Sequence, residues 1–180
     1  MDALKYRDVY TIDDIYALPE GQRGELIDGQ LYMMASPGLE HQEILGLLFR
    51  KIADCIESHA KDCKVVIAPF AVYLNNDDKT YVEPDLMVVC DSSKLDSKGV
   101  HGAPDFVVEV VSPSSKSLDH LKKLIKYHEA GVREYWIVDP IDKRVYVYDF
   151  EKDETSSYPF GEPVHSIICE DFAMDFSEFA

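Results

Sequence analysis

No stretch of the sequence is apolar over the roughly 20 residues that a bilayer-spanning helix needs. The N-terminus, MDALKYRDVYTIDD, is polar and lacks the apolar stretch of a secretory signal. We therefore expect no membrane association. We also expect the chain to remain in the compartment where it is made, the cytoplasm.

Cysteine is scarce, and its spacing does not match the usual metal-binding motifs. The four cysteines are Cys55, Cys63, Cys90 and Cys169, and none belongs to a C-x-x-C pair. A structural zinc site is therefore not expected. Cys90 ends a strand-like run, where a small buried thiol is the ordinary interpretation. Scattered cysteines without a disulfide framework fit a reducing compartment.

Positive charge is also scarce. The chain has 34 acidic and 18 basic residues, which gives a formal net charge of −16. Such a surface does not attract nucleic acid in general, although a local basic strip remains compatible with it. An excess of carboxylates suits a protein that gathers divalent cations. Solubility is the simpler explanation for most of these charges.

The glycine motifs of nucleotide-binding folds are missing too, since neither G-x-G-x-x-G nor a P-loop is present. The 180 residues, of which 46% are hydrophobic, are enough for one domain with a substantial core. No internal repeat, low-complexity tract or linker divides them. We therefore predict a single domain over residues 1–180.

Apolar periodicity and turn signals predict a mixture of helices and strands. Thr11 is a candidate N-cap with Asp14 three residues later, and Asp28-Gly29 predicts a hairpin turn. Residues 39–59 repeat apolar side chains at helical spacing, and residues 106–111 form an apolar run typical of a central strand. Further predicted elements are strands at 65–74 and 80–90, a helix at 117–130, two strands joined through Asp139-Pro140, and one or two short strands after Glu151. This order predicts an α/β (α+β) fold with a mixed sheet.

Two acids lie within apolar strands. Glu109 has two valines on either side, and an unpaired carboxylate there would cost several kcal/mol to bury, roughly, unless a partner or a metal compensated. Asp85 follows Pro84, which cannot donate to a β-ladder and so marks an edge or a distortion. Two carboxylates on neighbouring strands could share one hard divalent cation. A salt-bridged core acid at Glu109 and a turn-bonding acid at Asp85 are the alternatives.

Pro84-Asp85, followed by the strand acid Glu109, resembles the PD-(D/E)-x-K signature of restriction-endonuclease-like nucleases. The segments GELIDGQLY, VEPDLMVV, GAPDFVVEVVSPSS, D-x-x-x-K-x-x-x-Y and AGVREYWIVDP, in that order, are similar to the Uma-type family of that group. The similarity extends over about residues 10–150. It implies a restriction-endonuclease-like fold, in which helices flank a mixed central β-sheet and an N-terminal β-hairpin extends from it.

The resemblance also implies site residues. Asp85 and Glu109 would bind Mg²⁺ or Mn²⁺, and Glu25 would reach the same cleft as an additional ligand or base. An exposed acid at a strand end is the alternative for Glu25. His41, at the start of the long predicted helix, could face the cleft, although capping or surface positions are commoner for a lone histidine. Ser112 and Ser114 could position a phosphate, or simply belong to a turn.

The lysine of the signature is not at its usual place, because position 111 is Val111. The resemblance implies that Lys123, on the following helix between Asp119 and Tyr127, takes its role. Helical spacing alone favours Lys122, because an apolar face formed by Leu118, Leu121, Leu124 and Ile125 would place Lys123 nearly opposite its centre. We retain Lys123 as the predicted site residue, and Lys122 as the alternative.

The predicted function is metal-dependent hydrolysis of phosphodiester bonds, with DNA as the expected substrate. Asp85, Glu109, Lys123 and Glu25 would form the catalytic set. A homodimer is plausible, since cutting two strands favours paired sites. The alternative is a catalytically inactive, endonuclease-like binding or interaction module, which the acidic charge and Val111 favour.

Overall fold

A six-stranded mixed sheet organises the computed structural model, which describes residues 8–59, 62–112, 118–169 and 172–180, without the side chains of 118–120. The strand order is β10-β9-β8-β7-β5-β3, and β7 and β8 are parallel while the other neighbours are antiparallel. The strands are β3 (Lys64–Ile67), β5 (Leu86–Val89), β7 (Phe106–Val110), β8 (Glu134–Asp139), β9 (Arg144–Asp149) and β10 (Glu154–Pro159). The predicted mixed sheet is confirmed, and the central strand predicted at 106–111 is β7.

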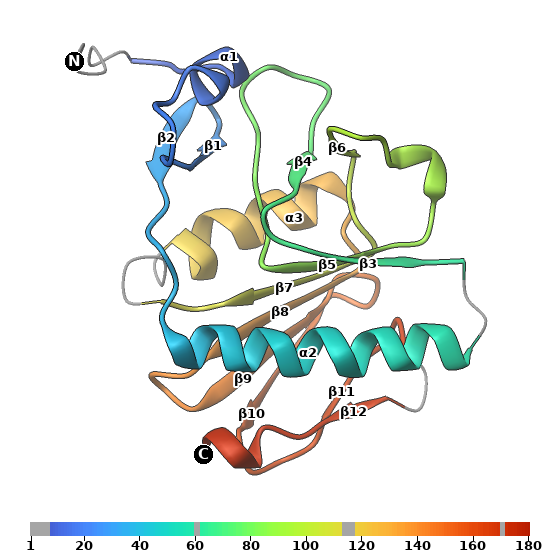
Figure 1. Cartoon of the computed structure of the whole chain (residues 1–180). Helices are drawn as coiled ribbons and strands as arrows, with labels where there is room; N and C mark the ends of the chain where they lie inside the picture. The colour runs from blue at the N-terminus through green and yellow to red at the C-terminus, as the bar shows by residue number, and fades with distance from the viewer. Residues whose placement is uncertain (1–7, 60–61, 113–117, 170–171) are drawn as a thin grey trace.

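Helices cover both faces of this sheet (Figure 1). Helix α2 (Leu39–Ser58) packs Ile44, Leu48 and Ile52 into one core, with the sheet side chains of Val108 and Trp136. Their sheet neighbours, such as Val107 and Tyr135, point to the opposite face, where Tyr127 of α3 (Leu124–Ala130) packs among them. Because successive side chains along a strand point to opposite faces of the sheet, the fold has two cores, one under each helix.

The N-terminal segment forms a small unit beside the sheet. It contains α1 (Ile12–Tyr16), whose capping box uses Thr11 and Asp14, and the antiparallel pair β1 (Gly24–Ile27) and β2 (Gln30–Met33). Asp28 and Gly29 both have positive φ, as a two-residue type I′ turn requires. The short parallel pair β4 (Ala71–Tyr73) and β6 (Gly99–His101) lies nearby, and a 3₁₀ turn, η1 (Ser92–Lys94), precedes β6. The predicted helix and hairpin are confirmed.

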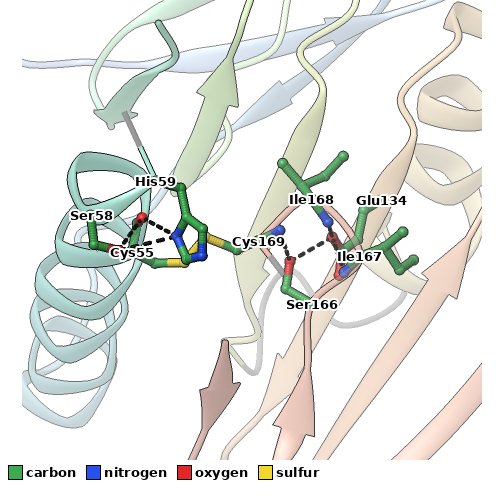
Figure 2. Close-up of a disulfide and its surroundings, with 8 residues drawn as sticks. All are labelled: Cys55, Ser58, His59, Glu134, Ser166, Ile167, Ile168 and Cys169. Carbon is green, nitrogen blue, oxygen red and sulfur yellow. Dashed lines mark hydrogen bonds between the residues drawn. A yellow bond between two sulfur atoms is a disulfide. The ribbon is translucent and has the colours of Figure 1, made fainter. Parts of the chain in front are cut away.

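The C-terminal segment packs against α2 and the sheet. It contains β11 (Val164–His165), β12 (Ala173–Met174) and η3 (Ser177–Phe179). Together with β10, this makes three strands after Glu151, one more than the sequence predicts. Glu134, which is fully buried, accepts hydrogen bonds from Ser166 Oγ and the backbone N–H groups of Ile167 and Ile168 (Figure 2). It also accepts one from Trp136 Nε1. One buried carboxylate therefore holds the segment against β8.

The expectation of free, scattered thiols is wrong. Cys55 on α2 is joined to Cys169 in the C-terminal segment, and Cys63 is joined to Cys90, so no free cysteine remains among the residues that the structure describes. The first pair is 114 residues apart in sequence, and Figure 2 shows it beside the Glu134 cluster. Cysteine spacing carries no information on such a pairing, because the contact exists only once the chain end packs under α2.

Two predicted strands are shorter than expected. The run 65–74 divides into β3 and β4, with the cis peptide Ala68-Pro69 between them. The run 80–90 becomes a strand only from Leu86 onward, after Pro84, while Tyr81 and Val82 form isolated bridges to Leu26 and Val72. Each interruption lies beside a proline, Pro69 or Pro84, which lacks the N–H that a β-ladder needs. No described helix combines the length and apolarity that a bilayer crossing needs.

Candidate active site

A cavity of about 790 Å³ opens between the N-terminal hairpin, the first turn of α2 and the ends of β5 and β7. Acidic, basic and apolar side chains line it together. The polar and charged side chains that line it are Arg23, Glu25, Tyr32, Ser36, His41, Gln42, Asp85, Glu109, Ser112, Lys122 and Lys123. All four predicted catalytic residues therefore lie around one space, although they come from four separate parts of the chain.

Glu109 and Glu25 share one buried lysine. Lys123 Nζ donates to Glu109 Oε1 at 2.9 Å and lies 2.8 Å from Glu25 Oε2. Tyr127 OH also donates to Glu109 Oε1, at 2.8 Å. The three charged side chains are only 3–5% exposed, so one ammonium partly offsets two carboxylates in a region that water barely reaches. Glu25 is thus a buried partner of the site lysine and not an exposed acid at a strand end.

Asp85 lies just before β5, next to the strand that carries Glu109. Leu86 pairs with Val108, and continuing this antiparallel register by one residue places Asp85 opposite Glu109. Asp85 Oδ2 accepts a hydrogen bond from Val110 N at 2.8 Å and lies 3.1 Å from His41 Nε2. Both contacts use Oδ2, so the described partners leave Oδ1 for a ligand. The start of α2 supplies His41, which fixes the orientation of this carboxylate.

A second layer of contacts supports Glu25 from behind. Glu83 N donates to Glu25 Oε1 at 2.8 Å, and the Glu83 side chain accepts from Arg23 Nε at 2.9 Å and from Tyr81 OH at 2.7 Å. Burial and the neighbouring Glu83 carboxylate raise the pKa of Tyr81, so its phenol stays protonated and can donate. The sequence analysis missed Arg23. It lies two residues before Glu25, and in an extended segment that spacing places both side chains on the same face, which could have identified it.

The helical-wheel choice of Lys122 differs from the structure. Residues Leu118–Lys123 form a π-helix before α3, and its wider turn changes which side chains face the sheet. Leu121 and Ile125, assigned to the apolar face at 100° per residue, are 64% and 54% exposed. Lys123 instead points inward, while Lys122 lies at the rim, where it donates to Gln30 Oε1 and Tyr32 OH.

Three further predicted contributors are placed only in part. Ser112 lines the cavity at the end of β7. Ser114 and the side chain of Asp119 lie outside the described residues. Among the aromatic residues of the β8–β9 hairpin, Trp136 and Tyr135 are fully buried, whereas Tyr146 and Tyr148 are half-buried. The chemical roles assigned to Asp85, Glu109, Lys123 and Glu25 stay predictions.

The side chains around the cavity include possible ligands for a divalent cation. Across the described residues, no three His, Cys, Asp or Glu side chains converge as a ready-made metal cage. Mg²⁺ needs no such cage, because it keeps several waters and commonly takes one or two carboxylates. Asp85 and Glu109 provide two. Glu25 and Glu109 share the single ammonium of Lys123, and Asp85 lines the same cavity, so a divalent cation would offset the excess of carboxylates there.

Comparison with known proteins agrees with this architecture. The Anabaena variabilis protein described as a putative nuclease belonging to DUF820 has a similar solved structure, with a TM-score of 0.76 and 18% sequence identity; the match covers 94% of this chain and 96% of that one. The "Uncharacterized protein slr1290" of Synechocystis is 28% identical over 136 residues, which are 73% of this chain and 68% of that protein. The model of the Uma2 family, described as "Putative restriction endonuclease", matches residues 12–178. The chain therefore belongs to the Uma2 family of putative restriction endonucleases.

Proposed function

We propose that this protein hydrolyses phosphodiester bonds in nucleic acid, with DNA as the expected substrate and Mg²⁺ or Mn²⁺ as the cofactor. The observation that supports this most strongly is the convergence of Asp85, Glu109 and a buried lysine on one cavity. Val111 occupies the position where the family signature has its lysine. The buried Lys123, which reaches Glu109 from the following helix, supports the proposal because it supplies the cationic group that Val111 cannot.

Each residue has a distinct proposed role. Asp85 and Glu109 hold the cation through their oxygens. Lys123 places an ammonium beside Glu109, where it stabilises charge on the scissile phosphate or orients the attacking water. Glu25 and Tyr127 act as positioning residues, because they fix Lys123 and Glu109 in place. The bound cation would supply a water of lowered pKa and a positive charge near the phosphate oxygens.

The decisive experiment is a cleavage assay on DNA and RNA, with Mg²⁺ and with Mn²⁺. Asp85→Asn keeps the shape of the side chain and an oxygen for the Val110 N–H, yet removes the charge that would bind the cation. We expect cleavage to fall by at least about 100-fold, the scale for losing one group that stabilises transition-state charge.

Asp28→Asn is the matched control. It removes one acidic charge from the exposed hairpin turn, where asparagine tolerates the positive φ, and it does not line the cavity. Cleavage by this variant should equal that of the wild type. A wild-type protein that cleaves nothing under these conditions would favour the alternative, an inactive endonuclease-like binding module. Equal cleavage by Asp85→Asn would assign the activity to a different site.

A further inference from the structure

We infer that the cavity takes one unpaired nucleotide, at a strand end or within a single-stranded stretch, and does not act on an intact duplex. This inference rests on the proposed function, because it names the substrate of the same site. Three features of the cavity carry it: the depth of its charged groups, the character of its walls and the small number of cations at its rim.

Depth is the first feature. Lys123 and Glu109 are 4% and 5% exposed, so the groups proposed to act on the phosphate lie at the floor of the cavity and not on its lip. The cavity, of about 790 Å³, falls in the range of about 300–1,000 Å³ that encloses a small-molecule ligand. A phosphodiester within a stacked duplex cannot reach such a floor. Its nucleotide must first leave the stack, which costs least when the nucleotide is already unpaired.

The walls are the second feature. Part of the cavity lining is apolar and comes from β2, the segment after it, α2 and β3. It contains Leu31, Met33, Met34, Leu45 and Ile67, and the ring of Tyr32 also lines the cavity. A nucleobase presents flat apolar faces that stack on such side chains, and methionine adapts its shape to them. A site that contacted only backbone phosphates would have no use for this wall.

The supply of cations is the third feature. Arg23 is paired with Glu83, and Lys123 with Glu25 and Glu109. Lys122 is the lining cation whose described contacts are all uncharged, namely Gln30 and the hydroxyl and ring of Tyr32. Proteins that grip duplex DNA neutralise about six to ten phosphates. With one such cation at the rim and a net charge of −16, a substrate with one or two phosphates at the site fits better.

The test compares one DNA strand with the same strand in a duplex, with 2-aminopurine at a single position. With Mg²⁺, the single strand should be cleaved at least about tenfold faster, since the cost of unstacking and unpairing a base falls on the duplex alone. With Ca²⁺, which also takes oxygen ligands, binding is read without relying on turnover. The single strand should give a saturable change in 2-aminopurine fluorescence, and the duplex should give none.

A cavity-blocking variant completes the design. Ala35 is exposed on the segment after β2 and lines the cavity, whereas Ala17 is exposed after α1 and does not. Ala35→Trp should weaken single-strand binding by about tenfold or more, the scale of one lost stacking contact, at an unchanged melting temperature. Ala17→Trp should bind as the wild type does.

The two proposals fail differently. Cleavage of the duplex as fast as the single strand overturns the unpaired-nucleotide inference and leaves the nuclease function standing. Absence of cleavage with saturable binding of the single strand alone overturns the nuclease function and supports the nucleotide site. Equal binding by Ala35→Trp and the wild type would show that the base enters elsewhere. Absence of both cleavage and binding overturns both proposals.

Discussion

Lys123 is an unusual side chain because it is charged, almost fully buried and shared between two acids. Its ammonium lies 2.8–2.9 Å from Glu25 and Glu109, so each carboxylate depends on the same cation. A long lysine side chain at the surface would sample many positions. Here the two acids fix its terminal atom, and such fixed geometry is what electrostatic catalysis requires.

The same burial makes Lys123 important for stability. In Lys123→Met, a side chain of similar length would leave Glu25 and Glu109 buried beside each other without a cation. We expect the free energy of unfolding at neutral pH, measured in urea, to fall by about 3–5 kcal/mol. Removing one of the two charges as well, in Lys123→Met with Glu25→Gln, should recover part of that loss.

Lys122→Met is the neighbouring control. Lys122 is exposed and contacts uncharged groups at the rim, so its loss should change the free energy of unfolding by less than about 1 kcal/mol. A loss at Lys122→Met as large as that at Lys123→Met would mean that the helix is rotated relative to the arrangement described above.

Glu134 is a second buried acid, and its ionisation should be visible in the stability. Burial raises its pKa, although the donors from Ser166, Trp136, Ile167 and Ile168 favour the charged form. The native state therefore holds this proton at pH values where the unfolded chain, with an ordinary pKa of about 4.3, has lost it. Stability from this group is present below that pH and is lost as the pH rises through the native pKa.

Glu134→Gln tests this directly. The amide NH2 group cannot accept a hydrogen bond, whereas both oxygens of the carboxyl group can, so the variant should lower the free energy of unfolding by about 1–3 kcal/mol. The difference between wild type and variant should be greatest near pH 4 and should shrink as the pH rises, when urea unfolding is followed across that range. A constant difference at every pH would mean that Glu134 has the same pKa in both states.

Among the elements, the N-terminal hairpin depends on one glycine. Gly29 has φ +77°, and an added Cβ would lie 2.6 Å from Val9 Cγ1. Gly29→Ala should therefore lower the free energy of unfolding by at least about 1–2 kcal/mol. Gly46, on the exposed side of α2, has open space around its Cβ position, and Gly46→Ala should raise stability by about 0.5–1 kcal/mol. Thermal and urea unfolding of both variants would check the opposite signs.

The elements that sequence predicted well are those with a local signal. Thr11 with Asp14, Asp28-Gly29 and the apolar spacing of residues 39–59 each specify an element through contacts a few residues apart, and the structure contains all three. The central strand 106–110 was also evident, because its unbroken apolar run is typical of burial on both faces.

The elements that sequence predicted poorly depend on distant contacts. The π-helix at Leu118–Lys123 deviates from 100° per residue, which is why the wheel favoured Lys122. The inward position of Lys123 is stabilised by Glu25, 98 residues earlier in the chain, and no periodicity reports such a partner. The convergence of Asp85 and Glu109 followed from strand pairing, but the contact of His41 with Asp85 required the position of α2.

At the scale of the whole molecule, one of the two disulfides connects parts that the sheet alone does not hold, and the other reinforces a strand pair. Cys55–Cys169 ties the C-terminal segment to α2 on the side where Glu134 also anchors it (Figure 2). Cys63–Cys90 joins the segments at the ends of the paired strands β3 and β5. None of the four cysteines lines the cavity, so the disulfides and the candidate site are separate features of the fold.

The whole molecule carries a net charge of −16, so cations gather loosely around it in addition to any that bind at a specific site. Cations that bind only the native state stabilise it, by about 2.7 kcal/mol at 100 times the dissociation constant. Mg²⁺ or Mn²⁺ should therefore raise the melting temperature by about 5–10 °C for a chain of this size. A monovalent salt at equal ionic strength gives the contribution of general screening, which is subtracted.

Asp85→Asn should abolish most of this metal-dependent rise, because it removes one of the two proposed carboxylate ligands. Asp28→Asn lowers the number of acidic charges by the same amount and leaves the cavity lining intact, so it should retain the full rise. The pair separates a specific site from cations gathered loosely around an acidic surface, since loose association depends on total charge and treats both variants alike. A full response in Asp85→Asn would place the metal elsewhere on the molecule.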